Sequence, residues 1–174
     1  KQKTMTSLLC KKSEKYKSKI RVLEHRITDR DGNGFVTYLG RDSKSEDGHN
    51  PFYGMCDEYH AHPNNDMMNV IESGFGARKS PLMWVITTAG TNPVAPCAKF
   101  ETTCKQILDG VIPNPGIFPL IFDVDEGEDW TSIDAWKRAN PSLGVSISLD
   151  YLNREYNKAL AEGSTAVSNF QTKN

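Results

Sequence analysis

The chain has 174 residues, with 21 Lys and Arg against 22 Asp and Glu, for a net charge of −1. Any attraction to nucleic acid or to a membrane surface must therefore come from local patches. A hydrophobic fraction of 37% and a mean hydropathy of −0.55 fit one globular domain, or a domain with an appendage, and lie outside the disordered range. The sequence shows no secretory h-region and no bilayer-spanning apolar run, and its four cysteines lack CxxC spacing, which favours a cytosolic protein with reduced thiols.

Residues 1–19 are basic, with seven lysines against a single acid, Glu14. We interpret them as a solvated helix face, because they lack the regular interleaving of aromatic side chains expected of a base-stacking surface. The alternative is an electrostatic contact with a nucleic-acid backbone.

Two strands, over residues 20–27 and 34–39, are predicted on either side of a turn at residues 28–33. The turn resembles the first positions of a calcium-binding EF-hand loop, but Gly40 stands where that loop needs a bidentate glutamate. A β-turn with Asp and Gly in their usual positions explains these residues better than a calcium site.

The central part of the chain alternates short apolar runs with helical patterns. This rhythm predicts an α/β fold, with a parallel sheet that carries helices on both faces. The expected segments, in chain order, are a strand at 51–56, a helix from Asn64 or Asn65 to about 74, a strand at 82–86, a helix at about 96–108 and a strand at 117–122.

Chemistry in open α/β sheets collects at the carboxyl ends of the strands. The first central strand ends in Asp57 and Glu58, and the next ends in Thr87, Thr88 and, two residues on, Gly90. Such a pair of carboxylates suits ATP hydrolysis, in which one holds Mg²⁺ and the other orients the attacking water. The threonines stand where a γ-phosphate could be sensed, and the glycine leaves the backbone room to approach a ligand.

Other candidate sites are weaker. His60 and His62, with His49 nearby, could supply zinc ligands, but no further Cys or His follows at ligand spacing, so we expect packed or hydrogen-bonded histidines. The acidic residues 123–129 could bind a divalent cation, and we interpret them as a solvated loop. A Walker A phosphate loop is missing, because Arg78 replaces the glycine that its nearest match, at residues 73–80, would require.

Beyond residue 125 the pattern becomes helical. Helices are predicted at about 132–138 and 149–162, without an apolar strand among them. We expect a small helical appendage on the α/β core.

The sequence resembles the large subunit of phage terminases, most specifically in three motifs. The motifs are DEYHAHP at 57–63, TTAG at 87–90 and ANPSLG at 139–144, in the order in which that family has them. The resemblance covers roughly residue 41 to the end. It implies part of a RecA-like P-loop NTPase, a motor that uses ATP and Mg²⁺ to drive double-stranded DNA into a procapsid.

The resemblance also implies roles for single residues. Asp57 would be the Walker B residue that holds Mg²⁺, and Glu58 the catalytic glutamate. Thr87 and Thr88 would belong to the motif that couples γ-phosphate loss to movement, and Arg41 is our candidate for an arginine finger. The implied partners are DNA, a terminase small subunit, a portal protein and further copies in a ring, in the cytoplasm of a bacterial host and without a membrane.

Three parts follow from the resemblance: the end of the ATPase core at 1–125, a helical linker at 126–165 and the start of a nuclease domain at 166–174. The chain begins at Lys1, and without Walker A we expect a piece that is inactive alone. Two alternatives stay open, another RecA-like nucleic-acid motor and a non-catalytic assembly or binding module.

Overall fold

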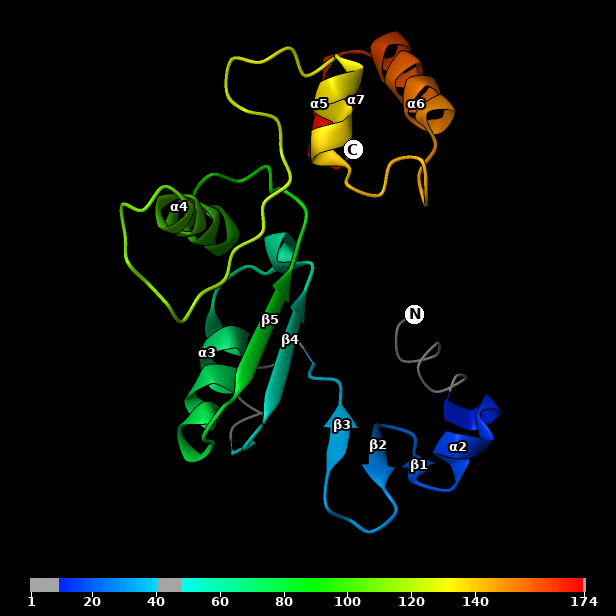
Figure 1. Cartoon of the computed structure of the whole chain (residues 1–174), viewed down its shortest axis with the longest axis vertical. Helices are drawn as coiled ribbons and strands as arrows, with labels where there is room; N and C mark the ends of the chain where they lie inside the picture. Colours follow the sequence, from blue (N-terminus) through cyan, green and yellow to red (C-terminus); the bar gives the residue numbers. More distant parts are fainter. Residues whose placement is uncertain (1–9, 41–47, 174) are drawn as a thin grey trace. The chain divides into compact units, whose positions relative to one another are not determined.

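The computed structural model describes residues 10–40 and 48–173. The chain divides into two units, Lys1–Asn50 and Pro51–Asn174 (Figure 1).

The first unit contains a small antiparallel sheet in the order β1-β2-β3. A short helix, α2 (Glu14–Lys17), precedes the sheet. Ile27 is the buried residue of the sheet. The strands are β1 (Ile20–Val22), β2 (Arg26–Asp29) and β3 (Phe35–Thr37).

The single strand predicted over residues 20–27 is wrong, because the chain turns back within it. The backbone N–H of Leu23 donates to the carbonyl of Arg26 at 2.9 Å, which closes a turn around Glu24 and His25. Both turn residues are exposed, so the polar pair interrupts the apolar run. The turn predicted at residues 28–33 is present between β2 and β3, where Gly32 has a φ of 77°.

The second unit contains the predicted pair of central strands. β4 (Tyr53–Asp57) and β5 (Leu82–Ile86) run parallel, with Tyr53 opposite Leu82 and Asp57 opposite Ile86. The two strands are connected through the 3-10 turn η2 (Tyr59–Ala61), the helix α3 (Asp66–Ser73) and the 3-10 turn η3 (Gly74–Ala77), and α4 (Pro96–Leu108) follows β5.

One face of this sheet is covered by α3 and η3. A Cβ atom at Gly54 would lie 2.6 Å from the Ile71 side chain, so only glycine lets the helix approach the strand this closely. The buried cluster on this side consists of Cys56, Tyr59, Met68 and Cys97.

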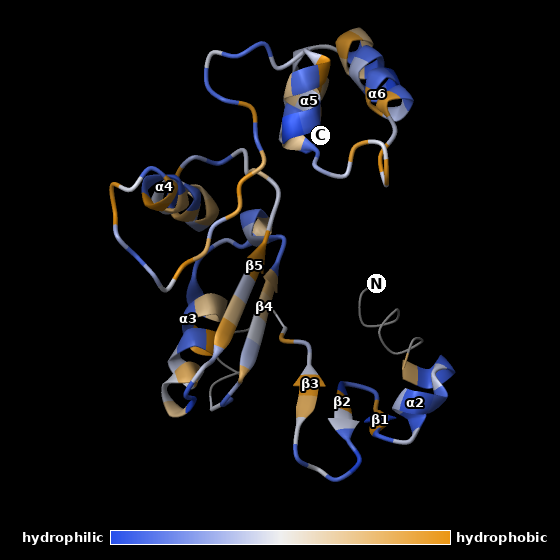
Figure 2. Cartoon of the chain, viewed as in Figure 1, coloured by the Kyte–Doolittle hydropathy of each residue, from blue (hydrophilic) through white to orange (hydrophobic). Residues whose placement is uncertain are grey.

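The other face is apolar and open. Side chains alternate along each strand, so one face collects large apolar residues that are 41–49% exposed. Figure 2 shows the hydrophobic colouring along β5. The residues of this open face are Tyr53, Met55, Leu82, Trp84 and Ile86.

The strand predicted at residues 117–122 is wrong, because the structure has no strand there. Its side chains alternate between half-buried and exposed, as in a strand, and Phe118 is 85% exposed. In the described part of the chain no strand pairs with it, and Pro119 has no N–H to donate. An ion pair from Lys105 to Asp123 (2.9 Å) ties the end of this segment to α4.

Three helices form the last part of the chain: α5 (Ile133–Ala139), α6 (Leu149–Glu162) and α7 (Ser164–Lys173). The first two match the prediction, and α7 was not predicted. Their side chains form a core of their own, with Leu152 fully buried. Rings of Trp136 and Phe170 lie 5.9 Å apart in this core.

The predicted α/β class is confirmed by the parallel strand pair with its connecting helix. Among the residues that the structure describes, none of the helices has the length and apolar character needed to span a membrane.

Candidate functional site

The ends of β4 and β5 lie at one edge of the sheet. Asp57 pairs with Ile86 in the parallel register, so the residues that follow, Glu58 and Thr87, leave the sheet side by side. Because parallel strands present their carboxyl ends at the same edge, carboxylates from one strand meet hydroxyls from the next.

Glu58 adopts a strained backbone conformation. Its φ of 54° and ψ of 47° lie in the left-handed region, and it is the one non-glycine residue in the described part of the chain with a positive φ. Its carbonyl accepts the N–H of Ala61 at 2.8 Å, which starts η2. Such strain costs about 1–3 kcal/mol and clusters at functional sites.

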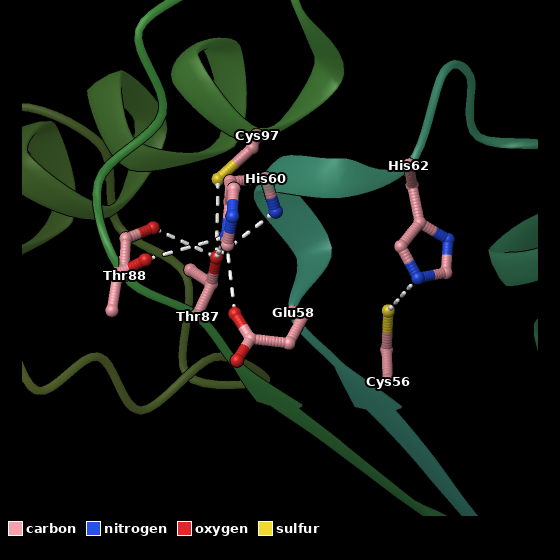
Figure 3. A network of polar contacts seen from close by, with 7 residues as sticks. All are labelled: Cys56, Glu58, His60, His62, Thr87, Thr88 and Cys97. Atoms are coloured by element: carbon pink, nitrogen blue, oxygen red, sulfur yellow. Dashed lines mark hydrogen bonds and ion pairs between the residues drawn. The ribbon is translucent and has the colours of Figure 1, made fainter. Parts of the chain in front are cut away.

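His60 joins the two strand ends (Figure 3). Its Nδ1 atom lies 3.3 Å from a carboxylate oxygen of Glu58, 3.1 Å from the hydroxyl oxygen of Thr87 and 3.4 Å from that of Thr88. Its backbone N–H also donates to the Thr87 hydroxyl at 2.9 Å. One histidine therefore contacts all three of the polar side chains that follow Asp57 and Ile86 at this edge.

The Thr87 hydroxyl is held from several sides. It donates to the carbonyl of Thr88 at 2.8 Å, accepts from His60, and lies 3.8 Å from the sulfur of Cys97 on α4. These contacts fix the side chain at the start of the loop after β5.

The second histidine of the tip faces a different partner. Figure 3 shows His62 beside Cys56. Its Nε2 atom lies 3.7 Å from the Cys56 sulfur, and the centroid of its ring lies 5.8 Å from that of Tyr59. The prediction of packed or hydrogen-bonded tip histidines is confirmed for both.

The thiols behind the edge are neutral. Burial raises the pKa of Cys56 to about 11, with Asp57 adding to the shift, and burial likewise raises the pKa of Cys97. All four cysteines are free, as the sequence predicts. The charge at this edge therefore comes from the carboxylates and not from thiolates.

The predicted site residues differ in how the structure places them. Glu58, Thr87 and Thr88 are brought together by His60, and Asp57 directly precedes them. Gly90 packs against His60, since a Cβ there would lie 3.3 Å from the histidine Cβ. Arg41 lies outside the described residues.

The linking role of His60 was not predicted from the sequence. The signal that could have revealed it is the register, because a parallel pair with residue 57 opposite 86 sets residue 58 opposite 87. The tip that follows Glu58 is then within reach of the threonines.

The chemistry of this edge suits a magnesium nucleotide. Asp57 and Glu58 offer carboxylate oxygens, and Thr87 and Thr88 offer hydroxyl oxygens, which are the hard donors that Mg²⁺ prefers. The donor set fits a site at which one or two carboxylates and the phosphates of a substrate share the ion.

The fold and the residues at the strand ends agree with one family of proteins. The family model described as "Terminase large subunit, ATPase domain" matches residues 2–106. The chain belongs to this family.

Two known proteins are similar to the chain. Protein YmfN of Escherichia coli (strain K12) is 38% identical over 126 residues, which is 72% of this chain and 27% of that protein. The crystal structure of the HK97 bacteriophage large terminase matches 98% of this chain with a TM-score of 0.81 at 19% identity, and the match covers 35% of that chain. This likeness confirms the predicted fold, and the chain spans about a third or less of either relative.

Proposed function

We propose that this chain is the Walker B and coupling portion of a terminase motor, in which ATP hydrolysis drives double-stranded DNA into a procapsid. The observation that carries the proposal is the sheet edge where Asp57 and Glu58 end one strand and Thr87 and Thr88 follow the next, in a chain that belongs to the terminase large subunit family. ATP would bind between this edge and a Walker A loop.

Each residue of the site has a specific role in the proposed reaction. Asp57 holds Mg²⁺, which neutralises charge on the β- and γ-phosphates when bound. Glu58 accepts a hydrogen bond from the attacking water and orients it toward the γ-phosphate. Thr87 and Thr88 register the loss of that phosphate, and Arg41 serves as the arginine finger.

The remaining assignments follow from the family. The ATPase core ends at 125, a helical linker occupies 126–165, and a nuclease domain starts at 166. The partners are double-stranded DNA, a small subunit, a portal and further copies in a ring, in the bacterial host cytoplasm. DNA is gripped through its phosphates, so its affinity should fall steeply with salt.

Substitution of the proposed magnesium ligand tests the function. In a terminase chain that carries this sequence together with a Walker A loop, Asp57→Asn should raise the Mg²⁺ concentration for half-maximal ATPase activity by about tenfold or more, because a neutral amide replaces a charged ligand. The measurement is steady-state ATP hydrolysis against Mg²⁺, with Asp125→Asn in the acidic loop as the matched control. An unchanged Mg²⁺ requirement in Asp57→Asn would remove this residue from the site.

A further inference from the structure

We infer that His60 is a positioning residue for ATP hydrolysis, which holds the Glu58 carboxylate against the end of β5. This inference rests on the proposed function. It adds His60 to the residues proposed for ATP hydrolysis, which are the two carboxylates and the two threonines.

The carboxylate of Glu58 is exposed. Its side chain is 61% exposed, so packing leaves the carboxylate free to rotate. A group that must orient water needs a fixed direction, because small misplacements of reacting groups cost large factors in rate. The contact that provides this direction is the Nδ1 atom of His60, 3.3 Å from the carboxylate and on a side chain that is only 31% exposed.

The hydrogen bonds determine how the histidine is oriented. The Thr87 hydroxyl donates its proton to the Thr88 carbonyl and accepts from the His60 N–H. A carboxylate only accepts, so a proton on Nδ1 of His60 makes the 3.3 Å contact with Glu58 favourable, and the same atom lies within hydrogen-bond distance of the Thr87 and Thr88 hydroxyls. The ring is thus hydrogen-bonded to the threonines that follow β5 and lies 3.3 Å from the Glu58 carboxylate that follows β4.

Gly90 leaves the space that this arrangement needs. A Cβ at residue 90 would lie 3.3 Å from the Cβ of His60, closer than most such contacts. The glycine therefore lets the loop after β5 pass directly behind the histidine.

The test compares substitutions at His60 in a terminase chain that carries this sequence together with a Walker A loop. His60→Leu keeps the volume and removes the donor. His60→Asn retains a polar amide where Nδ1 lies, and His60→Gln places its amide farther out, near the position of Nε2. We expect the kcat for ATP to fall about tenfold or more in His60→Leu and His60→Gln, to recover in His60→Asn, and the KM for ATP to stay unchanged.

Two controls make the result decisive. His62→Leu changes the other tip histidine, which faces Cys56, and should retain kcat within about twofold of the unchanged chain. The thermal unfolding midpoints of His60→Leu and His60→Asn are also compared. If they are equal, loss of fold is excluded as the cause of the lower kcat in His60→Leu. Equal kcat in all His60 variants, beside an inactive Glu58→Gln, would overturn this inference and leave the proposed function intact. Full turnover by Glu58→Gln would overturn both.

Discussion

At the scale of single residues, Glu58 combines an exposed carboxylate with a left-handed backbone. For a residue with a Cβ atom this backbone conformation costs about 1–2 kcal/mol of conformational free energy, and for glycine it does not. The strain persists because η2 begins at this carbonyl and His60 follows at once. We interpret it as the cost of aiming the carboxylate out of the sheet edge.

A pair of substitutions at this position measures the strain. Glu58→Gly should be more stable than Glu58→Ala by about 1 kcal/mol, because glycine adopts the positive φ without a Cβ clash. Neither variant should hydrolyse ATP. Urea unfolding of the 174-residue chain gives the two free energies. The same pair at the half-buried Glu155 in α6 should show the opposite order, because glycine weakens a helix interior. Equal stability of the two Glu58 variants would mean that the backbone relaxes there.

Sequence reasoning reached the carboxylates but not the residue between them and the threonines. Asp57 and Glu58 are readable because they end an apolar run. His60 becomes informative only when the register of β4 and β5 is known, since its partners lie 27 and 28 residues away. Nothing local in the tip indicates those contacts.

At the scale of elements, the open face of the β4–β5 pair is the feature with the clearest consequence. Parallel strands are normally covered on both faces, and here α3 and η3 cover one. Trp84 lies on the other face, between Leu82 and Ile86, with each of them more than 40% exposed. Apolar surface of this kind attracts other apolar molecules in water.

The open face should bind an apolar dye. Trp84→Lys should lower the fluorescence of 1-anilinonaphthalene-8-sulfonate (ANS) bound to the 174-residue chain, because a charge then interrupts the face. Val145→Lys is the matched control. Val145 is 92% exposed in a loop, so this substitution removes an isolated apolar side chain. Circular dichroism checks that both variants keep their secondary structure. An equal loss of fluorescence in the two variants would show that dye binding is not specific to this face.

The wrongly predicted strand and the helix that was not predicted both depend on contacts with distant residues. Residues 117–122 have the alternation of a strand, but a strand needs a neighbour, and the sequence pattern cannot say whether one is present. Helix α7 contains Thr165, Val167 and Asn169, which are weak helix formers, and burial of Phe170 beside Trp136 stabilises it. By contrast, α4 was predicted at Pro96–Leu108 because proline stands at its start and its apolar residues are regularly spaced.

At the scale of the whole molecule, two buried cores lie on either side of residue 125. The first contains Cys56 and Tyr59 beside the strand pair, and the second contains Trp136 and Leu152 among the last three helices. The proposed boundary between ATPase core and linker falls between them. The chain spans 27% of YmfN. The proposed interactions with DNA, with the portal and with further copies in a ring therefore concern a longer protein that contains this sequence.

The central claim is that Glu58 activates water for ATP hydrolysis at this sheet edge. The most direct measurement is the Mg²⁺-dependent ATPase rate of Glu58→Gln, in a terminase chain with a Walker A loop, beside the matched control Glu126→Gln. The account predicts a loss of about 100-fold or more in kcat for Glu58→Gln with ATP still bound, and an unchanged rate for Glu126→Gln. Turnover by Glu58→Gln at the rate of the unchanged chain would contradict the account and favour a non-catalytic assembly module.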